Sequence, residues 1–221
     1  MSKKTLMASV PVAILIIAVV VPAMAQATRL QAPAGTELAN SSTVLLQRYG
    51  DFTVRTYVNE KKETPEAELV CKKGFSEGTS TAVQGETAEA TISKDVLSEC
   101  ASGGFTQDIL SNASGAAPWR LQIQQPDSFG GVTAHIIPAS GSTILYTVQI
   151  QYFGIDVASC VYSASSIHIT GTTGSDIYTI SSGNSTVMKV SGPTPCGQYG
   201  FLSGSYQMET GNNNPVTVDM S

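Results

Sequence analysis

The chain has 221 residues, and 12 lysines and arginines against 17 aspartates and glutamates give it a net charge of −5. A polyanion would be repelled by this charge, so nucleic acids and anionic membrane surfaces are excluded as partners. Charged residues make up only 13% of the chain. From Leu110 to the C-terminus only seven acids and bases occur besides the two histidines. Solubility there must come from Ser, Thr, Asn, Gln and Gly, which suit the outward faces of exported β-strands.

Residues 1–25 have the pattern of an export signal. Two lysines, Lys3 and Lys4, precede a long apolar run, and a proline break leads into the small-x-small pattern that ends at Ala25. We predict cleavage after Ala25 or, in a second register, after Ala27, and a secreted or extracytoplasmic mature protein. Cleavage leaves 10 basic and 17 acidic side chains, a net charge of 10 − 17 = −7. An uncleaved membrane anchor is the alternative, because the run approaches the roughly 20 residues that span a bilayer.

The mature chain is predicted to hold one domain. Residues 26–42 are polar, contain Ala, Gly and Pro and show no period, so we expect a flexible N-terminal lead. Residues 43–221 are long enough to bury a substantial core and form a single β domain. No second apolar run matches the first in length, so no membrane span is expected after cleavage.

Apolar and polar residues alternate along most of this domain. The clearest run places Tyr146, Val148, Ile150 and Tyr152 on one face and Thr147, Gln149 and Gln151 on the other. The same period occurs, in chain order, in residues 52–56, 119–124, 167–169, 202–209 and 216–220. Gly- and Asn-containing turns separate these runs, and a short helical turn is allowed only at 94–98. The pattern predicts an all-β fold, an antiparallel β-sandwich of immunoglobulin-like or jelly-roll-like type.

Four cysteines in an exported chain indicate two structural disulfides, for which three pairings exist. We expect Cys71–Cys100 and Cys160–Cys196, because sequential pairing staples each half of the domain separately. A metal site or a redox pair would need cysteines two residues apart or closely spaced Cys and His, and this spacing is absent. We therefore predict no metal, no cofactor and a disulfide-stapled fold.

No motif for a common secreted chemistry is present. The nucleophile elbow Gly-x-Ser-x-Gly is missing, and His135 and His168 lie in alternating segments that strand periodicity explains. Asp156, Asp176 and Glu209 are the acids that could act on a glycan or bind calcium, but their positions are typical of turn and surface acids. We predict no catalytic residue.

Exposed aromatic rings are the main candidates for ligand contact, because sugar faces stack on them in secreted β proteins. Trp119, Tyr146, Tyr152 and Tyr206 are assigned to the core by parity. Possible surface rings are therefore Phe153, Tyr162, Tyr199 and Phe201.

Landmarks in the second half resemble a family. They are Pro118-Trp119 opening a strand, Cys160-Val161-Tyr162, the run CGQYGFLSGSY that starts at Cys196, and Pro215 to Val218. In order and chemistry they resemble uncharacterised secreted all-β proteins of actinobacterial type. The resemblance implies a signal peptide, a compact β domain and paired cysteines, and it brings no known activity.

Together these features predict an exported, non-enzymatic β domain with a structural, surface-associated or ligand-binding role. Its partner is expected in the cell envelope or among extracellular glycans or proteins. The alternative is a secreted protein that binds or hydrolyses glycans across a groove of the sandwich.

Overall fold

The computed structural model describes residues 27–59, 65–102, 105–138, 143–181, 185–194 and 196–220. The predicted export signal and its cleavage site after Ala25 lie outside these residues. Within the described ranges all regular structure is β-strand, and no helix there has the length and hydropathy to cross a membrane.

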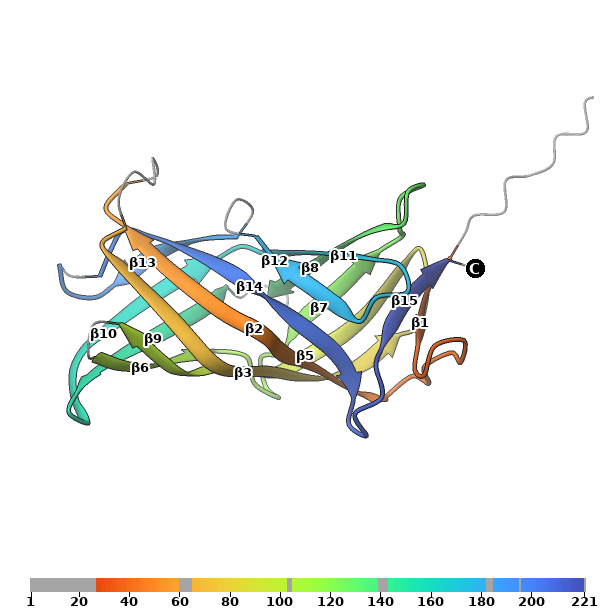
Figure 1. Ribbon diagram of the computed structural model, residues 1–221, viewed down its shortest axis with the longest axis horizontal. Helices are drawn as coiled ribbons and strands as arrows, with labels where there is room; N and C mark the ends of the chain where they lie inside the picture. The colour runs from red at the N-terminus through yellow and green to blue at the C-terminus, as the bar shows by residue number, and fades with distance from the viewer. Residues whose placement is uncertain are drawn as a thin grey trace, which may run out of the picture.

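Strand follows strand from Thr28 to Met220, with only turns and loops between them in the described residues (Figure 1). Their bounds are β1 Thr28–Gln31, β2 Thr43–Tyr57, β3 Ala67–Ala82, β4 Gln84–Gly85, β5 Thr87–Ser102, β6 Phe105–Ser111, β7 Trp119–Gln124, β8 Gly131–Pro138, β9 Ile144–Tyr152, β10 Ile155–Ala164, β11 Ile167–Thr172, β12 Ile177–Ile180, β13 Thr186–Ser191, β14 Tyr199–Thr210 and β15 Thr217–Met220. All pairings between them are antiparallel. The helical turn allowed at 94–98 is wrong, because these residues continue β5 and pair with β3.

Four long strands, β5, β3, β2 and β14, form one wall along the length of the molecule. Two groups of shorter strands face this wall. One group runs β7, β8, β11 and β12, and the other runs β6, β9, β10 and β13. Additional pairings of β12 with β14 and of β5 with β6 join the edges of both groups to the long wall. The core thus lies between facing layers of one continuous antiparallel sheet, and the predicted all-β, sandwich-like fold is confirmed.

Parity along the strands decides which side chains reach the core. Trp119, Leu121 and Ile123 of β7 are buried, whereas Arg120 and Gln124 between and after them are exposed. Trp119, Tyr146 and Tyr206 are all buried, which confirms their assignment to the core. Burial of these apolar side chains supplies the main driving force for closing the sheet.

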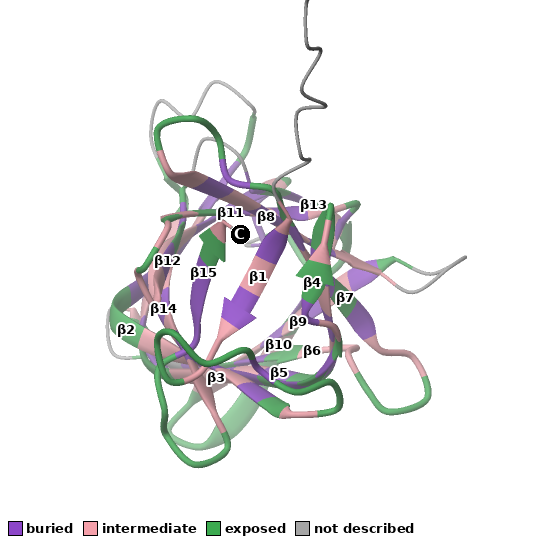
Figure 2. Ribbon diagram, turned by 90° about the vertical axis from the view of Figure 1, so that its right-hand side faces the viewer, coloured by how far each residue is buried: buried purple, intermediate pink, exposed green. Residues whose placement is uncertain are grey.

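A small sheet of β15, β1 and β4 crosses one end of the molecule (Figure 2). Leu30 of β1 and Val218 of β15 are register partners, and both are fully buried. The flexible lead expected for 26–42 is therefore corrected, because β1 is an ordered strand held by the C-terminal strand. Leu38, later in the same segment, is also buried.

Both predicted disulfides are confirmed. Cys71–Cys100 joins neighbouring positions of β3 and β5, and Cys160–Cys196 joins β10 to the segment that precedes β14. Their sequence separations of 29 and 36 residues leave each half of the domain with its own staple. Two such bonds are consistent with an oxidising compartment.

Candidate binding site

The end of the molecule opposite the small sheet carries the hairpin between β9 and β10. Phe153 and Gly154 form its two-residue turn, with φ angles of 51° and 78°. Positive φ at both central residues is the condition for the tight turn that matches strand twist. Tyr152 and Ile155 are register partners directly before and after this turn. The turn therefore holds two large apolar side chains side by side at the tip.

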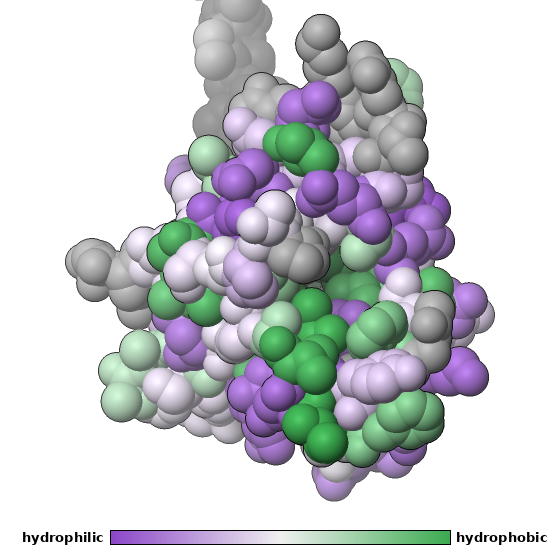
Figure 3. Space-filling model, turned by 90° about the vertical axis from the view of Figure 1, so that its left-hand side faces the viewer, coloured by the Kyte–Doolittle hydropathy of each residue, from purple (hydrophilic) through white to green (hydrophobic). Residues whose placement is uncertain are grey.

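Apolar side chains at this end extend beyond the core. Phe153 is 87% exposed and Ile155 68% exposed, and Tyr152, Val157 and Phe105 are also exposed. The Phe105 and Tyr152 ring centroids lie 5.1 Å apart, and those of Tyr152 and Phe153 lie 4.5 Å apart. We call these five residues the apolar tip. Figure 3 looks onto this end and shows hydrophobic side chains gathered at its centre and lower part.

Sequence parity explains why the tip is apolar. Tyr152 continues the inward face of Tyr146, Val148 and Ile150, as predicted, but it lies past the last layer of the core. Its assignment to the core is corrected for this reason. The strand continues the core pattern into solvent, and an exposed group of apolar side chains is a candidate interaction site.

A small cavity of about 40 Å³ lies behind the tip. Gln107 and Thr56 line it, and the Oε1 atom of Gln107 and the Oγ1 atom of Thr56 make no hydrogen bond within the protein. Val148, Tyr162 and the Cys160–Cys196 bond supply apolar walls. A space of this size suits water-sized molecules and not a lipid chain or a sugar ring. A larger partner must therefore contact the outside of this end.

The four aromatic rings predicted to lie at the surface differ in their exposure. Phe153 is exposed at the tip, and Tyr199 is half-buried. Tyr162 and Phe201 are buried, so their assignment to the surface is corrected. Tyr162 shares the inward parity of Cys160, while Phe201 faces outward but packs edge-on against Tyr57 with ring centroids 5.3 Å apart. Phe105 and Ile155 were missed because exposure at a strand end depends on tertiary structure.

The two histidines lie on neighbouring strands. His135 of β8 and His168 of β11 are register partners with ring centroids 4.2 Å apart. Partial burial, followed by the proximity of His168, lowers the pKa of His135. Both flank buried residues of their strands, as expected of strand histidines on an outer face.

The three candidate acids do not gather around one groove. Asp156 accepts a hydrogen bond from Gln151 Nε2 at 2.8 Å, and Asp176 accepts one from Gln207 Nε2 at 2.7 Å. Glu209 lies on β14 next to the turn into β15. In the described ranges no group of three His, Cys, Asp or Glu side chains could hold a metal ion.

A buried acid that the sequence did not reveal lies inside the core. Ser76 Oγ donates a hydrogen bond of 2.6 Å to Asp95 Oδ1. Burial raises the pKa of Asp95 to about 6, and hydrogen bonds from Ser76 and Tyr146 oppose this rise. The carboxyl group faces the interior and is closed off from solvent, so a substrate cannot reach it.

A groove of about 480 Å³ lies at the end closed by the small sheet. Its lining consists mainly of short side chains such as Ala39, Ser42 and Thr43, with Glu37 as its charged member. Such a lining offers neither aromatic rings nor clustered charge. The apolar tip is therefore the stronger candidate for a binding site.

Among the described residues, the fold is a disulfide-bonded, all-β domain that exposes a group of apolar side chains at one end. Comparisons with protein-family models, curated proteins and solved structures found no match to this chain.

Proposed function

We propose that this protein is an exported, non-enzymatic β domain that associates with the surface of a lipid bilayer through the apolar tip. One observation carries the proposal: five apolar side chains, three of them aromatic, are exposed together on and beside a single hairpin. Exposing them to water is unfavourable, so burying them in a partner releases free energy.

The shape and composition of the tip favour a lipid surface over a protein. A hairpin is narrow and convex, whereas a stable protein interface needs about 800 Å² of complementary surface on each partner. A lipid interface accepts a protruding apolar group without a matching pocket. Tyrosine is enriched at such interfaces, where its ring is apolar and its hydroxyl remains hydrated.

Ring geometry favours lipid over the predicted glycan alternative. The Phe105 and Tyr152 planes are inclined by 40°, and the Tyr152 and Phe153 planes by 67°. These rings do not share a plane on which successive sugar faces could stack. Ile155 and Val157 beside them also offer no hydrogen bond to a sugar hydroxyl.

Vesicle co-sedimentation tests the proposal. The mature protein should sediment with phosphatidylcholine vesicles, and Phe153→Ser combined with Ile155→Ser should weaken partitioning by at least about tenfold, since burying one large apolar side chain contributes about 1.5–3 kcal/mol. Binding should persist in high salt, because the chain's negative charge leaves apolar burial as the driving force.

Phe129→Ser is the matched control. Phe129 is 97% exposed in the turn between β7 and β8. Its neighbour Gly130 accepts a hydrogen bond from Thr173, and the adjacent Gly174 donates one to Val218 of the small sheet, so this turn lies at the opposite end from the apolar tip. This variant should bind vesicles as the wild type does. Absence of vesicle binding by the wild type would contradict the proposal. Retention on insoluble polysaccharide that depends on Phe153 would favour the glycan alternative instead.

A further inference from the structure

The pairing of β2 with β3 breaks in the middle of the long wall. Gln47 pairs with Phe75 and Phe52 with Cys71, so β2 uses one residue more than β3 between these two points. Gly50, at φ 75°, lies within the extra segment. The strands separate here, and a groove of about 260 Å³ opens between them. Its lining residues are Gln47, Arg48, Lys72, Lys73, Gly74 and Phe75.

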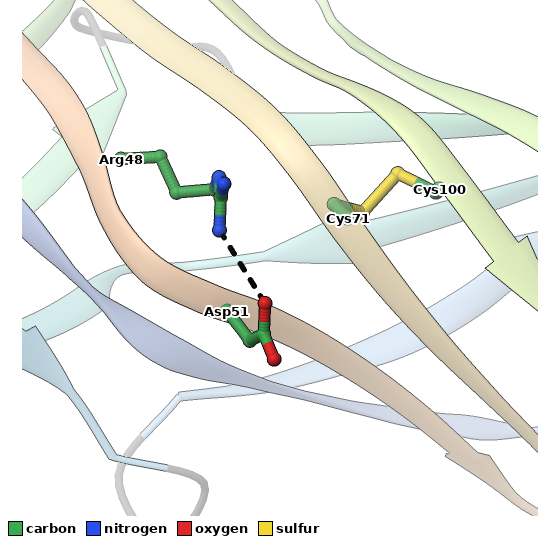
Figure 4. Close-up of polar contacts among 4 residues, drawn as sticks. All are labelled: Arg48, Asp51, Cys71 and Cys100. Atoms are coloured by element: carbon green, nitrogen blue, oxygen red, sulfur yellow. Dashed lines mark ion pairs between the residues drawn. A yellow bond between two sulfur atoms is a disulfide. The ribbon is translucent and has the colours of Figure 1, made fainter.

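Arg48 reaches into this groove with unused hydrogen-bond donors. Its side chain is only 17% exposed, and its buried Nε and Nη1 atoms have no hydrogen-bond partner. The nearest carboxylate oxygen is Asp51 Oδ1, 3.8 Å from Nη1 and beyond hydrogen-bonding distance (Figure 4). Buried donors without partners are unfavourable, and a guanidinium offers them in a fork that fits an oxyanion.

The local charge has the opposite sign to that of the chain. Arg48, Lys72 and Lys73 line the groove, against Asp51 and Glu99 as neighbouring acids. Glu99 forms its ion pair with Lys73, and Asp51 is largely exposed to solvent, where a single ion pair is weak. Among the described residues Lys72 makes no ion pair. A positive groove thus lies on a protein whose net charge is −5.

We propose that this groove binds a phosphate-type oxyanion, either free or as an ester. The Arg48 guanidinium would donate to it from the buried side, and the Lys72 and Lys73 ammonium groups would face it as point charges from the mouth. Donors on several sides suit a tetrahedral phosphate or sulfate better than a planar carboxylate. The site is independent of the apolar tip.

Thermal unfolding of the mature protein tests this site. Inorganic phosphate should raise the melting temperature in a concentration-dependent way, because a ligand that binds only the folded state stabilises it. Sodium chloride of equal ionic strength should not. Arg48→Gln and Lys72→Gln should each lose most of the phosphate-dependent shift. Arg120→Gln, which changes an exposed arginine of β7, should keep it.

Comparing two phosphate compounds distinguishes an esterified ligand from the free anion. A larger shift with glycerol phosphate supports an esterified phosphate as the ligand, and a response to inorganic phosphate alone supports the free anion. An equal shift in wild type and Arg48→Gln, or an equal shift with chloride, overturns the proposal. Should Arg48→Gln not fold, the exposed Lys72→Gln decides, and an undiminished shift in that variant overturns the proposal.

Discussion

Asp95 places a carboxyl group in the apolar interior, where its neighbours are the hydroxyl groups of Ser76 and Tyr146. Burial raises its pKa from 3.8 to about 6, and also raises the pKa of Tyr146. Burial therefore extends the pH range in which the neutral acid predominates from below about 4 to below about 6. Ionising it in place works against folding, because the charge cannot be hydrated.

The raised pKa of Asp95 predicts a pH-dependent loss of stability. The folded-state pKa of Asp95 lies above the unfolded value. The contribution of Asp95 to the free energy of unfolding is therefore fully present below pH 4 and is lost as the pH rises through 6. The loss amounts to about 3 kcal/mol, from 1.36 kcal/mol per pKa unit. Asp95→Asn cannot ionise, so its unfolding free energy relative to wild type should rise between pH 4 and pH 8. Denaturant unfolding at both pH values measures this, and parallel profiles would contradict it.

Sequence parity predicted most buried side chains but not this acid. Alternation places Trp119 and Tyr206 in the core without further information. Asp95 faces inward because one extra residue of β5 lies between Ile92, the partner of Gly78, and Lys94, the partner of Glu77. That bulge reverses the parity of the strand, and only the register with β3 reveals it. Arg48 faces its groove through a similar irregularity in β2.

At the scale of elements, the β9–β10 hairpin depends on neighbouring residues in the sequence, whereas β1 depends on a partner strand far along the chain. Tyr152-Phe153-Gly154-Ile155 has a local turn signal in Gly154 between alternating flanks, although this turn was not among the predicted ones. β1 has four residues, and its Thr28 pairs with Met220 at the other end of the chain. A strand this short has no measurable period, and its pairing depends on closure of the whole sheet. For this reason the segment was mistaken for a flexible lead.

Removal of β1 should destabilise the domain. A protein that starts after Gln31 leaves Val218 and the core end beneath it uncovered, whereas one that starts at Thr28 keeps the strand. We expect the shorter protein to melt at least several degrees lower, because exposing buried Leu and Val side chains costs about 1.5–3 kcal/mol each. Equal melting temperatures by calorimetry would show that β1 does not stabilise the fold.

For the whole molecule, the two ends differ in whether a further sheet covers the core. The small sheet covers the core at one end, with Leu30, Val216 and Val218 buried beneath or within it. At the other end the core pattern continues into the exposed residues Tyr152 and Ile155. Among the described residues, a group of apolar side chains is thus exposed at one end of a negatively charged molecule, as the proposed association with lipid requires.

Fluorescence of a Phe153→Trp variant tests association with lipid most directly. The chain's one native tryptophan, Trp119, is buried in the core, so its emission provides a constant background. Phosphatidylcholine vesicles should shift the emission of the new tryptophan to shorter wavelength, and brominated lipid should quench it, while Phe129→Trp remains unaffected. An emission spectrum of folded Phe153→Trp that does not change with vesicles would contradict the account.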